Sequence, residues 1–308
     1  MDVLTTVDAD RIASDQSAGH QFWLDLVDPA DEEIDRLGEQ LGLHPVAVED
    51  TREFNQRPKV DVYEDHVLLV YYTARLEESG AVTAIEVHVY AASGFLITVR
   101  RDRCDILDDL RARVEEMYEH PVYEILDTLT DAFYPVIEGL EERVDALEAE
   151  VLTRPRRDQL ATIYRLLQQV RGIGRVASVQ RDQFEAASDD LARLVALHDT
   201  GEYLRDIGDH LAQVAGELHR QSEDLSALTS TYFNANADRL NAVATRLTVV
   251  GTLFVLWTLV TGFFGQNFAW LVNHVESRTS FLVFGVGGLV VPTLLLLTLF
   301  WMKRRDWF

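Results

Sequence analysis

Two long uncharged segments dominate the hydropathy pattern near the C-terminal end of the chain. Residues 247–264 and residues 281–302 contain no charged side chain. As an α-helix, the shorter segment would cover about 27 Å, close to the roughly 30 Å of hydrocarbon in a bilayer. A buried helix of a globular protein is the alternative for either segment alone. Two such segments joined by a short loop predict two transmembrane helices.

The charges that flank these segments predict how the chain crosses the membrane. Arg239 and Arg246 precede the first segment, and three basic residues, 303–305, follow the second. The loop between the segments contains only Glu276 and Arg278 as charged residues. Because cytoplasmic flanks carry the excess of Lys and Arg, we expect both termini in the cytoplasm and a multi-pass protein of the plasma membrane.

Before the spans, residues 1–120 alternate between strand-like and helix-like patterns. Residues 22–27 form one strand candidate, and residues 60–74 and 83–100 are rich in Val, Ile, Tyr and Thr. Asp28 is expected to cap a helix that begins at Pro29, since Asp favours the N-cap and Pro the first helical position. The pattern predicts a cytosolic α/β domain on a mixed or antiparallel sheet.

From Tyr118 onward the pattern is helical, and Pro155 among arginines suits a turn between two long helices. After these two helices, a further helix should run from residue 202 into the first span without a break. Its apolar residues recur at spacings of three, four or seven, typical of a helix in a bundle: Leu204, Ile207, Leu211, Val214, Leu218, Leu225, Leu228 and Tyr232. A rod about 90 Å long cannot bury this stripe alone, so we expect other copies of the chain to cover it.

These patterns divide the chain into six parts and predict an α+β cytosolic domain carried on a long helical stalk above two C-terminal transmembrane helices. The expected boundaries are a cytosolic α/β domain at 1–120, a long-helix hairpin and stalk at 121–246, a first transmembrane helix at 247–265, an extracellular loop at 266–280, a second transmembrane helix at 281–302 and a basic cytosolic tail at 303–308.

The first span is not uniformly apolar, because small and polar residues recur along one face of it. Their spacings are three and four, so they share a side of the helix: Asn241, Thr245, Thr248, Thr252, Val255, Thr258 and Gly262. Such a stripe suits either close helix packing or a water-filled channel. The stripe alone favours packing, because Thr often bonds back to its own helix; a pore would need a ring of identical subunits.

Composition narrows the possible partners. The net charge of −23 argues against a nucleic-acid partner and would concentrate cations, although a solvated acidic surface explains it as well. Cys104 is the single cysteine, and the nine histidines show no zinc-ligand spacing. We find no signal peptide, so we expect the soluble part to stay in the cytoplasm. We find no phosphate loop, nucleophile motif or paired catalytic constellation, so we expect neither an enzyme nor an organic cofactor.

The absence of carboxylates from the two spans bears on which ion could pass. Neutral oxygens can hold the water shell of a divalent cation without removing it, and Mg²⁺ gives up its water reluctantly. A cage of carboxylates would instead bind the ion too tightly for release. The stripe is therefore compatible with passage of hydrated divalent cations.

The end of the first span resembles the Gly-Met-Asn signature of the CorA family of magnesium and cobalt channels, here as Gly265-Gln266-Asn267. The resemblance extends over nearly the whole chain. It includes residues 23–26, 43–45, 49–50 and 56–60 with Tyr63 in the N-terminal part, residues 204–206 with 209–210 in the stalk, Tyr232, Asn241, Leu247 and the basic, aromatic tail at 303–308.

This resemblance implies a homopentameric funnel whose first spans form an inner ring. It places Asn267 at the extracellular pore mouth, where it meets the hydrated ion, beside Gly265 and Gln266 at the pore entrance. Apolar residues that gate such pores correspond to Leu247 and Val255. Channels of the family are closed by intracellular Mg²⁺ bound between subunits, which makes Asp206 a candidate regulatory metal ligand on the stalk.

The chain departs from the family pattern at four places. Gln266 replaces the signature methionine, Leu256 stands where many members have proline, and Ala269 stands where an acid usually follows the motif. Residues 244–245 replace a Met-Lys pair near the inner mouth. These differences put in doubt which ion is physiological.

The function predicted from the sequence is transport of Mg²⁺, Co²⁺ or Ni²⁺ through a homopentameric channel gated by intracellular divalent cation, which is both substrate and regulator. The expected partners are identical subunits, the membrane and metal ions. A zinc transporter of the same superfamily, with or without coupling to protons, is the first alternative; a non-conducting membrane sensor of metal ions is the second.

Overall fold

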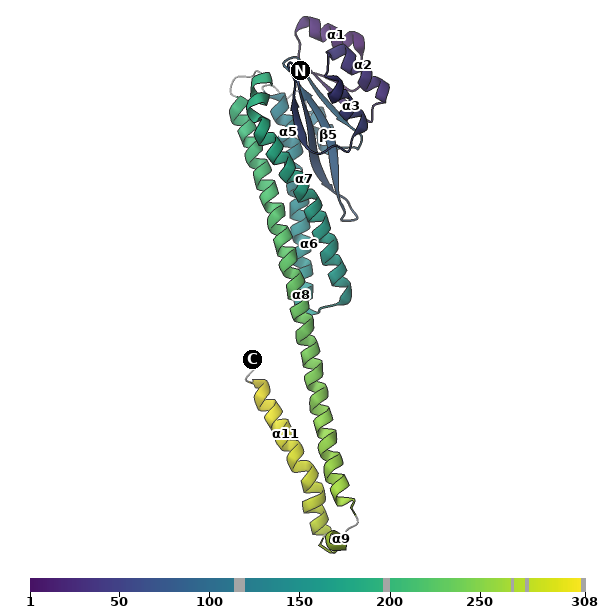
Figure 1. Ribbon diagram of the computed structural model, residues 1–308, viewed down its shortest axis with the longest axis vertical. Helices are drawn as coiled ribbons and strands as arrows, with labels where there is room; N and C mark the ends of the chain where they lie inside the picture. The colour runs from purple at the N-terminus through teal and green to yellow at the C-terminus, as the bar shows by residue number, and fades with distance from the viewer. Residues whose placement is uncertain (114–119, 196–199, 267–268, 275–276, 306–308) are drawn as a thin grey trace. The chain divides into compact units, whose positions relative to one another are not determined.

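The computed structural model describes all residues except 114–119, 196–199, 267–268, 275–276 and 306–308. It divides into two compact units, Met1–Tyr232 and Phe233–Phe308. Each unit is described separately below, and Figure 1 shows the elements that each contains.

The first unit is built on a six-stranded sheet in the order β1-β2-β6-β5-β4-β3. The strands are β1 (Asp2–Leu4), β2 (Phe22–Val27), β3 (Lys59–Val62), β4 (Val67–Leu76), β5 (Val82–Ala91) and β6 (Phe95–Arg100). β1, β2 and β6 pair in parallel, whereas β6, β5, β4 and β3 pair antiparallel. The mixed sheet that the strand patterns predicted is confirmed.

The central strands are apolar almost without a break, and successive side chains point to opposite faces, so both sheet faces carry a core. One face packs against helices α1 (Ala9–Ala18), α2 (Asp31–Leu41) and α3 (Pro45–Glu53) in a cluster that includes Ile12, Leu37 and Ala47. The other face packs against α4 (Asp105–Ala112), α5 (Pro121–Asp131) and the long helices described below, through residues such as Trp23 and Ile125. The sheet therefore forms the middle layer of the domain.

The predicted start of the helix that follows residues 22–27 is wrong. Asp28 does not cap a helix: it has φ +49°, and its N–H donates to the Arg100 carbonyl at 2.7 Å, which extends the β2–β6 pairing by one residue. Helix α2 begins three residues later at Asp31, where the Glu33 carboxylate accepts from the Ala30 N–H at 3.0 Å. The long-range strand pairing outweighs the local preference for a cap at Asp28.

The helical part of the first unit is a hairpin that packs along a third helix. α6 (Phe133–Thr153) and α7 (Arg157–Val195) are joined by the short turn that contains Pro155, as predicted, and α8 runs from Thr200 to Phe264. Figure 1 shows α5, α6 and α7 beside the first part of α8. A buried polar side chain also connects α8 to α6, because the side-chain amide of Gln221 donates to the Ile137 carbonyl at 2.9 Å.

The expectation that other copies of the chain cover the apolar stripe of α8 is wrong. All eight residues from Leu204 to Tyr232 are buried within the chain itself. They lie in two clusters with residues of α5, α6 and α7, among them Leu129, Leu140 and Val170. The hairpin supplies the partner helices that the sequence spacing could not identify. Only the remaining face of α8 is available to a second copy.

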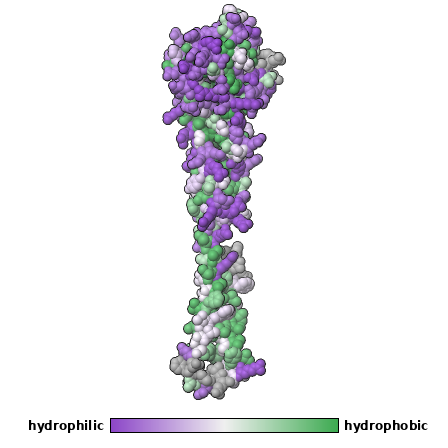
Figure 2. All heavy atoms as spheres, turned by 90° about the vertical axis from the view of Figure 1, so that its right-hand side faces the viewer, coloured by the Kyte–Doolittle hydropathy of each residue, from purple (hydrophilic) through white to green (hydrophobic). Residues whose placement is uncertain are grey.

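The second unit contains the apolar helices. The end of α8 is followed by α9 (Ala269–His274), α10 (Arg278–Ser280), a π-helical segment at Phe281–Val286 and α11 (Gly287–Arg305). Two helices, Gly201–Phe264 and Arg278–Met302, are long and apolar enough to cross a membrane, and none of their most apolar windows is buried in the structure. Figure 2 shows the resulting apolar surface in green.

The contacts between the two apolar helices include a small residue and a hydrogen bond. A Cβ added to Gly288 of α11 would lie 3.6 Å from Val260, so the helices come into ordinary van der Waals contact there. The Trp257 indole N–H donates to the Thr293 hydroxyl at 2.9 Å. Small residues and interhelical hydrogen bonds are the usual means by which helices associate in a membrane.

Candidate pore lining and candidate cation site

The polar stripe of the first span lies on the exposed surface of α8. Its seven residues are all exposed in the chain, and Leu247 and Val255, the candidates for an apolar gate, expose 72% and 69% of their surface. The threonines occupy turns of a regular helix between Asn241 and Gly262. Nothing within the described residues of the chain covers this face.

The threonine hydroxyls of the stripe donate their hydrogens to backbone carbonyls of the same helix. Thr245, Thr248, Thr252 and Thr258 each donate to the carbonyl four residues earlier, at 2.7–2.9 Å. A hydroxyl has one donor and two acceptor lone pairs. Once its proton is bonded to the helix, the oxygen offers only acceptor capacity to the outside. The stripe therefore presents a column of hydrogen-bond acceptors without any charge.

The second span packs on a different side of α8. Between Asn241 and Phe264, the partly buried residues of α8 are apolar and recur at spacings of three and four: Val249, Leu253, Leu256, Val260 and Phe264. At about 100° per residue, this set is centred roughly 120° away from the polar stripe. Packing between the two spans of one chain thus leaves the stripe free and does not account for its polarity.

At the predicted pore entrance, neither Gly265 nor Gln266 has a positive φ. The Gly265 N–H donates to the Thr261 carbonyl at 2.8 Å, and the Gln266 N–H donates to the Phe263 carbonyl at 3.3 Å. A Cβ at Gly265 would lie 3.1 Å from the Thr261 carbonyl oxygen, which is a tight contact and favours glycine there. Asn267, the third residue of the predicted entrance, lies outside the described residues.

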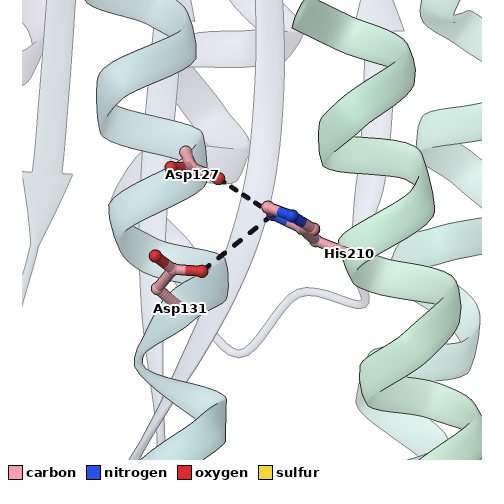
Figure 3. Close-up of side chains that lie close together, drawn as sticks. All are labelled: Asp127, Asp131 and His210. Carbon is pink, nitrogen blue, oxygen red and sulfur yellow. Dashed lines mark hydrogen bonds and ion pairs between the residues drawn. The ribbon is translucent and has the colours of Figure 1, made fainter.

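A second polar cluster lies in the first unit, where α5 faces α8. Asp127 and Asp131 are one turn apart on α5, and His210 extends toward them from α8 (Figure 3). The Nδ1 atom of His210 is 3.0 Å from an Asp127 oxygen and 4.0 Å from an Asp131 oxygen. One ligand atom from each of the three residues lies within 4.8 Å of the others. Two carboxylates and an imidazole at this spacing can hold a divalent cation.

The electrostatics of the cluster favour a cation. Burial, and then the charge of Asp131, raise the pKa of Asp127 above its ordinary value, whereas the hydrogen bond with His210 opposes the rise. The pKa of a carboxyl group is raised in this way when nearby positive charge compensates its negative charge poorly. A bound divalent cation would supply the missing positive charge.

Asp206, the regulatory residue predicted from the sequence, lies beside this cluster but is not one of its three members. Its Oδ1 is 3.8 Å from His210 Nε2, and its Oδ2 accepts a hydrogen bond from the Tyr123 hydroxyl at 2.8 Å. Sequence reasoning missed Asp127 and Asp131. The available signal was the pairing of two acids four residues apart on one helix with Asp206 and His210, also four apart, on another.

Three comparisons with known proteins agree with this architecture. The sequence model of a family described as CorA-like Mg²⁺ transporter protein matches residues 19–305. A cobalt/magnesium transport protein CorA from Thermotoga maritima is 22% identical over 315 residues, covering 98% of this chain and 88% of that protein.

Solved structures show the same fold. The complete CorA magnesium transporter of Methanocaldococcus jannaschii matches with a TM-score of 0.73 and 21% identity, over 90% of this chain and 89% of that one. The full-length CmaX protein matches with a TM-score of 0.67 and 22% identity, over 92% and 87% of the two chains. The predicted fold class, a mixed soluble domain with a long helix and two apolar C-terminal helices, is confirmed.

Proposed function

The chain belongs to the family of CorA-like Mg²⁺ transporter proteins, and from that premise we propose that it conducts hydrated divalent cations through a pore lined by α8. Membership makes the chain a membrane transporter of divalent cations and not an enzyme, as the sequence predicted. The proposed cargo is Mg²⁺, Co²⁺ or Ni²⁺.

The observation that carries the proposal is the column of acceptor oxygens on the exposed face of α8. Water molecules bound to a cation direct their hydrogens outward, so the hydrated ion is a hydrogen-bond donor on every side. Acceptor-only hydroxyls match that shell, and they let Mg²⁺ keep the water that it loses reluctantly. The stripe has no carboxylate that would trap the ion, which permits release.

One chain contributes one stripe, so the pore requires copies arranged around an axis. We propose five copies, the number that the family resemblance implies, in a plasma membrane with both termini in the cytoplasm. The basic residues near Arg246 and at 303–305 support that orientation. Gly265, Gln266 and Asn267 would form the entrance, and Leu247 and Val255 the apolar gate.

The cluster of Asp127, Asp131 and His210 is proposed as the cation site that closes the channel. It joins α5 to α8, the helix that continues as the first span, so a cation bound there stabilises one arrangement of the two helices. A ligand shifts a two-state equilibrium toward the state that binds it more tightly. Rising intracellular cation would then favour the closed state.

Ion flux into liposomes tests the transport proposal. Vesicles that contain the full-length protein should take up Mg²⁺, Co²⁺ and Ni²⁺, and Asn267→Ala should reduce uptake at least tenfold, because the resemblance places this amide at the entrance. Zn²⁺ uptake that depends on a pH gradient would favour the zinc-transporter alternative. Absence of any conduction in planar bilayers would leave the non-conducting sensor and refute the channel.

The regulatory site predicts a pH dependence through Asp127. Because its pKa is raised in the folded protein, Asp127 favours folding when protonated, and this contribution is lost as the pH rises through the folded pKa. Cation binding requires the ionised form. We therefore expect the rise in Tm produced by Mg²⁺ to shrink as the pH falls toward the raised pKa of Asp127. Thermal unfolding with and without Mg²⁺ at each pH measures it; a constant rise would contradict the assignment of Asp127.

A further inference from the structure

Tyr123, Asp206 and His210 form a series of contacts that leads from a partly buried tyrosine, packed against the core of the first unit, to the proposed cation site. The Tyr123 hydroxyl donates to Asp206 Oδ2 at 2.8 Å, and the other carboxylate oxygen of Asp206 faces His210 Nε2 at 3.8 Å. His210 in turn directs Nδ1 toward Asp127 and Asp131. Asp206 thus uses one oxygen for the tyrosine and the other for the imidazole.

The tyrosine is held in place at the far end of this series. Its ring packs against Tyr203 with centroids 4.9 Å apart, and Tyr203 packs against His120 at 4.1 Å. Tyr123 and Asp127 are four residues apart on α5, so the hydroxyl and the cation ligand lie on the same face of one helix. Burial, followed by the hydrogen bond to Asp206, raises the pKa of Tyr123, so the hydroxyl remains a donor.

An imidazole that binds a metal through one nitrogen commonly donates its other N–H to a carboxylate, which fixes the tautomer and the orientation of the ring. Nδ1 of His210 faces the two aspartates, and a cation bound at Nδ1 would leave the ring proton on Nε2, which faces Asp206 Oδ1 at 3.8 Å, an ion-pair distance that is longer than a hydrogen bond. Asp206 is positioned to act through His210 rather than on the cation directly.

We propose that Tyr123 and Asp206 are positioning residues that hold the His210 imidazole toward Asp127 and Asp131, and that this gives the site a preference for divalent cations that accept a nitrogen ligand. Imidazole suits transition-metal ions such as Co²⁺ and Ni²⁺, whereas carboxylates and water suit Mg²⁺. The inference rests on the proposed regulatory site and adds what sets its cation preference.

The test is the binding of Co²⁺ and of Mg²⁺ to the full-length protein, measured by calorimetry, with the Co²⁺ absorption spectrum as a report of the nitrogen ligand. Tyr123→Phe keeps the packed ring and removes only the hydroxyl. It should weaken Co²⁺ binding by about ten- to a hundredfold, the usual effect of removing a partner that orients a metal ligand, and Mg²⁺ binding by less than about twofold. Tyr203→Phe, which keeps the neighbouring ring, is the matched control and should change neither.

A double-mutant cycle separates positioning from direct ligation. In a His210→Gln background, Tyr123→Phe should have no further effect on Co²⁺ binding, because Tyr123 acts on the cation only through the His210 imidazole. Three results would overturn the positioning role of Tyr123 and Asp206: equal weakening of Co²⁺ and Mg²⁺ binding by Tyr123→Phe, tighter Co²⁺ binding in that variant, or an effect of Tyr123→Phe that persists without His210. If the wild-type protein does not bind Co²⁺, or if Asp127→Asn leaves that binding unchanged, both the proposed regulatory site and the positioning role of Tyr123 and Asp206 fail. Binding is measured without flux, so a failure of transport leaves this test intact.

Discussion

Replacing Thr252 with valine is expected to reduce Mg²⁺ and Co²⁺ influx by at least tenfold. Valine has the shape of threonine but no oxygen, so each subunit loses one acceptor from the proposed pore lining. A net loss of about 0.5 kcal/mol for each hydrogen bond, repeated in the five copies proposed above, sums to about 2.5 kcal/mol, and about 1.4 kcal/mol corresponds to a factor of ten. Uptake into liposomes at equal protein content measures the change.

Thr261→Val is the matched control for this experiment. Thr261 also donates to the carbonyl four residues earlier, here that of Trp257 at 2.8 Å, so both variants lose the same helix contact. It is nine residues from Thr252, which places it about half a turn away around the helix. We expect its uptake to stay within about twofold of the wild type. Equal loss in both variants would indicate damage to the helix and would contradict the assignment of the stripe as pore lining.

The second large effect is expected at the regulatory site. Asp127→Asn should raise the intracellular Mg²⁺ concentration that half-inhibits influx by at least tenfold, because an amide is a neutral and weaker ligand than a carboxylate. The asparagine oxygen can still accept from His210, so the local contact between α5 and α8 is retained. Influx into vesicles preloaded with a series of Mg²⁺ concentrations gives the inhibition curve.

Glu124→Gln serves as the control, since Glu124 lies on the same helix, one turn from the end at which α5 begins, and outside the cluster of three ligands. It removes one negative charge from α5 as well. A shift in Glu124→Gln as large as that in Asp127→Asn would mean that the general charge of α5, and not a defined site, controls inhibition. Unchanged inhibition in Asp127→Asn would remove this cluster from the gating mechanism.

The proposed pore and the proposed regulatory site would select ions in different ways. The stripe of α8 offers neutral acceptors at several successive turns, an arrangement that accommodates any hydrated divalent cation of suitable size. The regulatory cluster offers two charged oxygens and a nitrogen, which discriminate by ligand chemistry. The cation that passes the pore and the cation that closes it most effectively therefore need not be the same. Comparing the two preferences in one set of flux and binding measurements would show whether they diverge.

Much of this architecture follows from periodicity along the chain. The apolar run at 247–264, the turn at Pro155 and the spaced residues from Leu204 to Tyr232 each depend on neighbours within a few positions, because helical periodicity and hydrocarbon length are local properties. The same holds for the stripe of Thr248 and Thr252, whose common face is set by spacing alone. These features were predictable, and the structure contains the corresponding helices.

Contacts between distant residues settled the rest. Spacing could not reveal that α5, α6 and α7 cover the apolar stripe of α8, because many partners satisfy the same hydrophobic pattern. Nor could it place Asp127 beside His210, 83 residues later, since two helices must dock before their side chains meet. Asp28 shows the same limit: its local preference for a cap gave way to pairing with Arg100 on another strand. Local sequence specifies elements and their faces, whereas which faces meet depends on the packing of the whole chain.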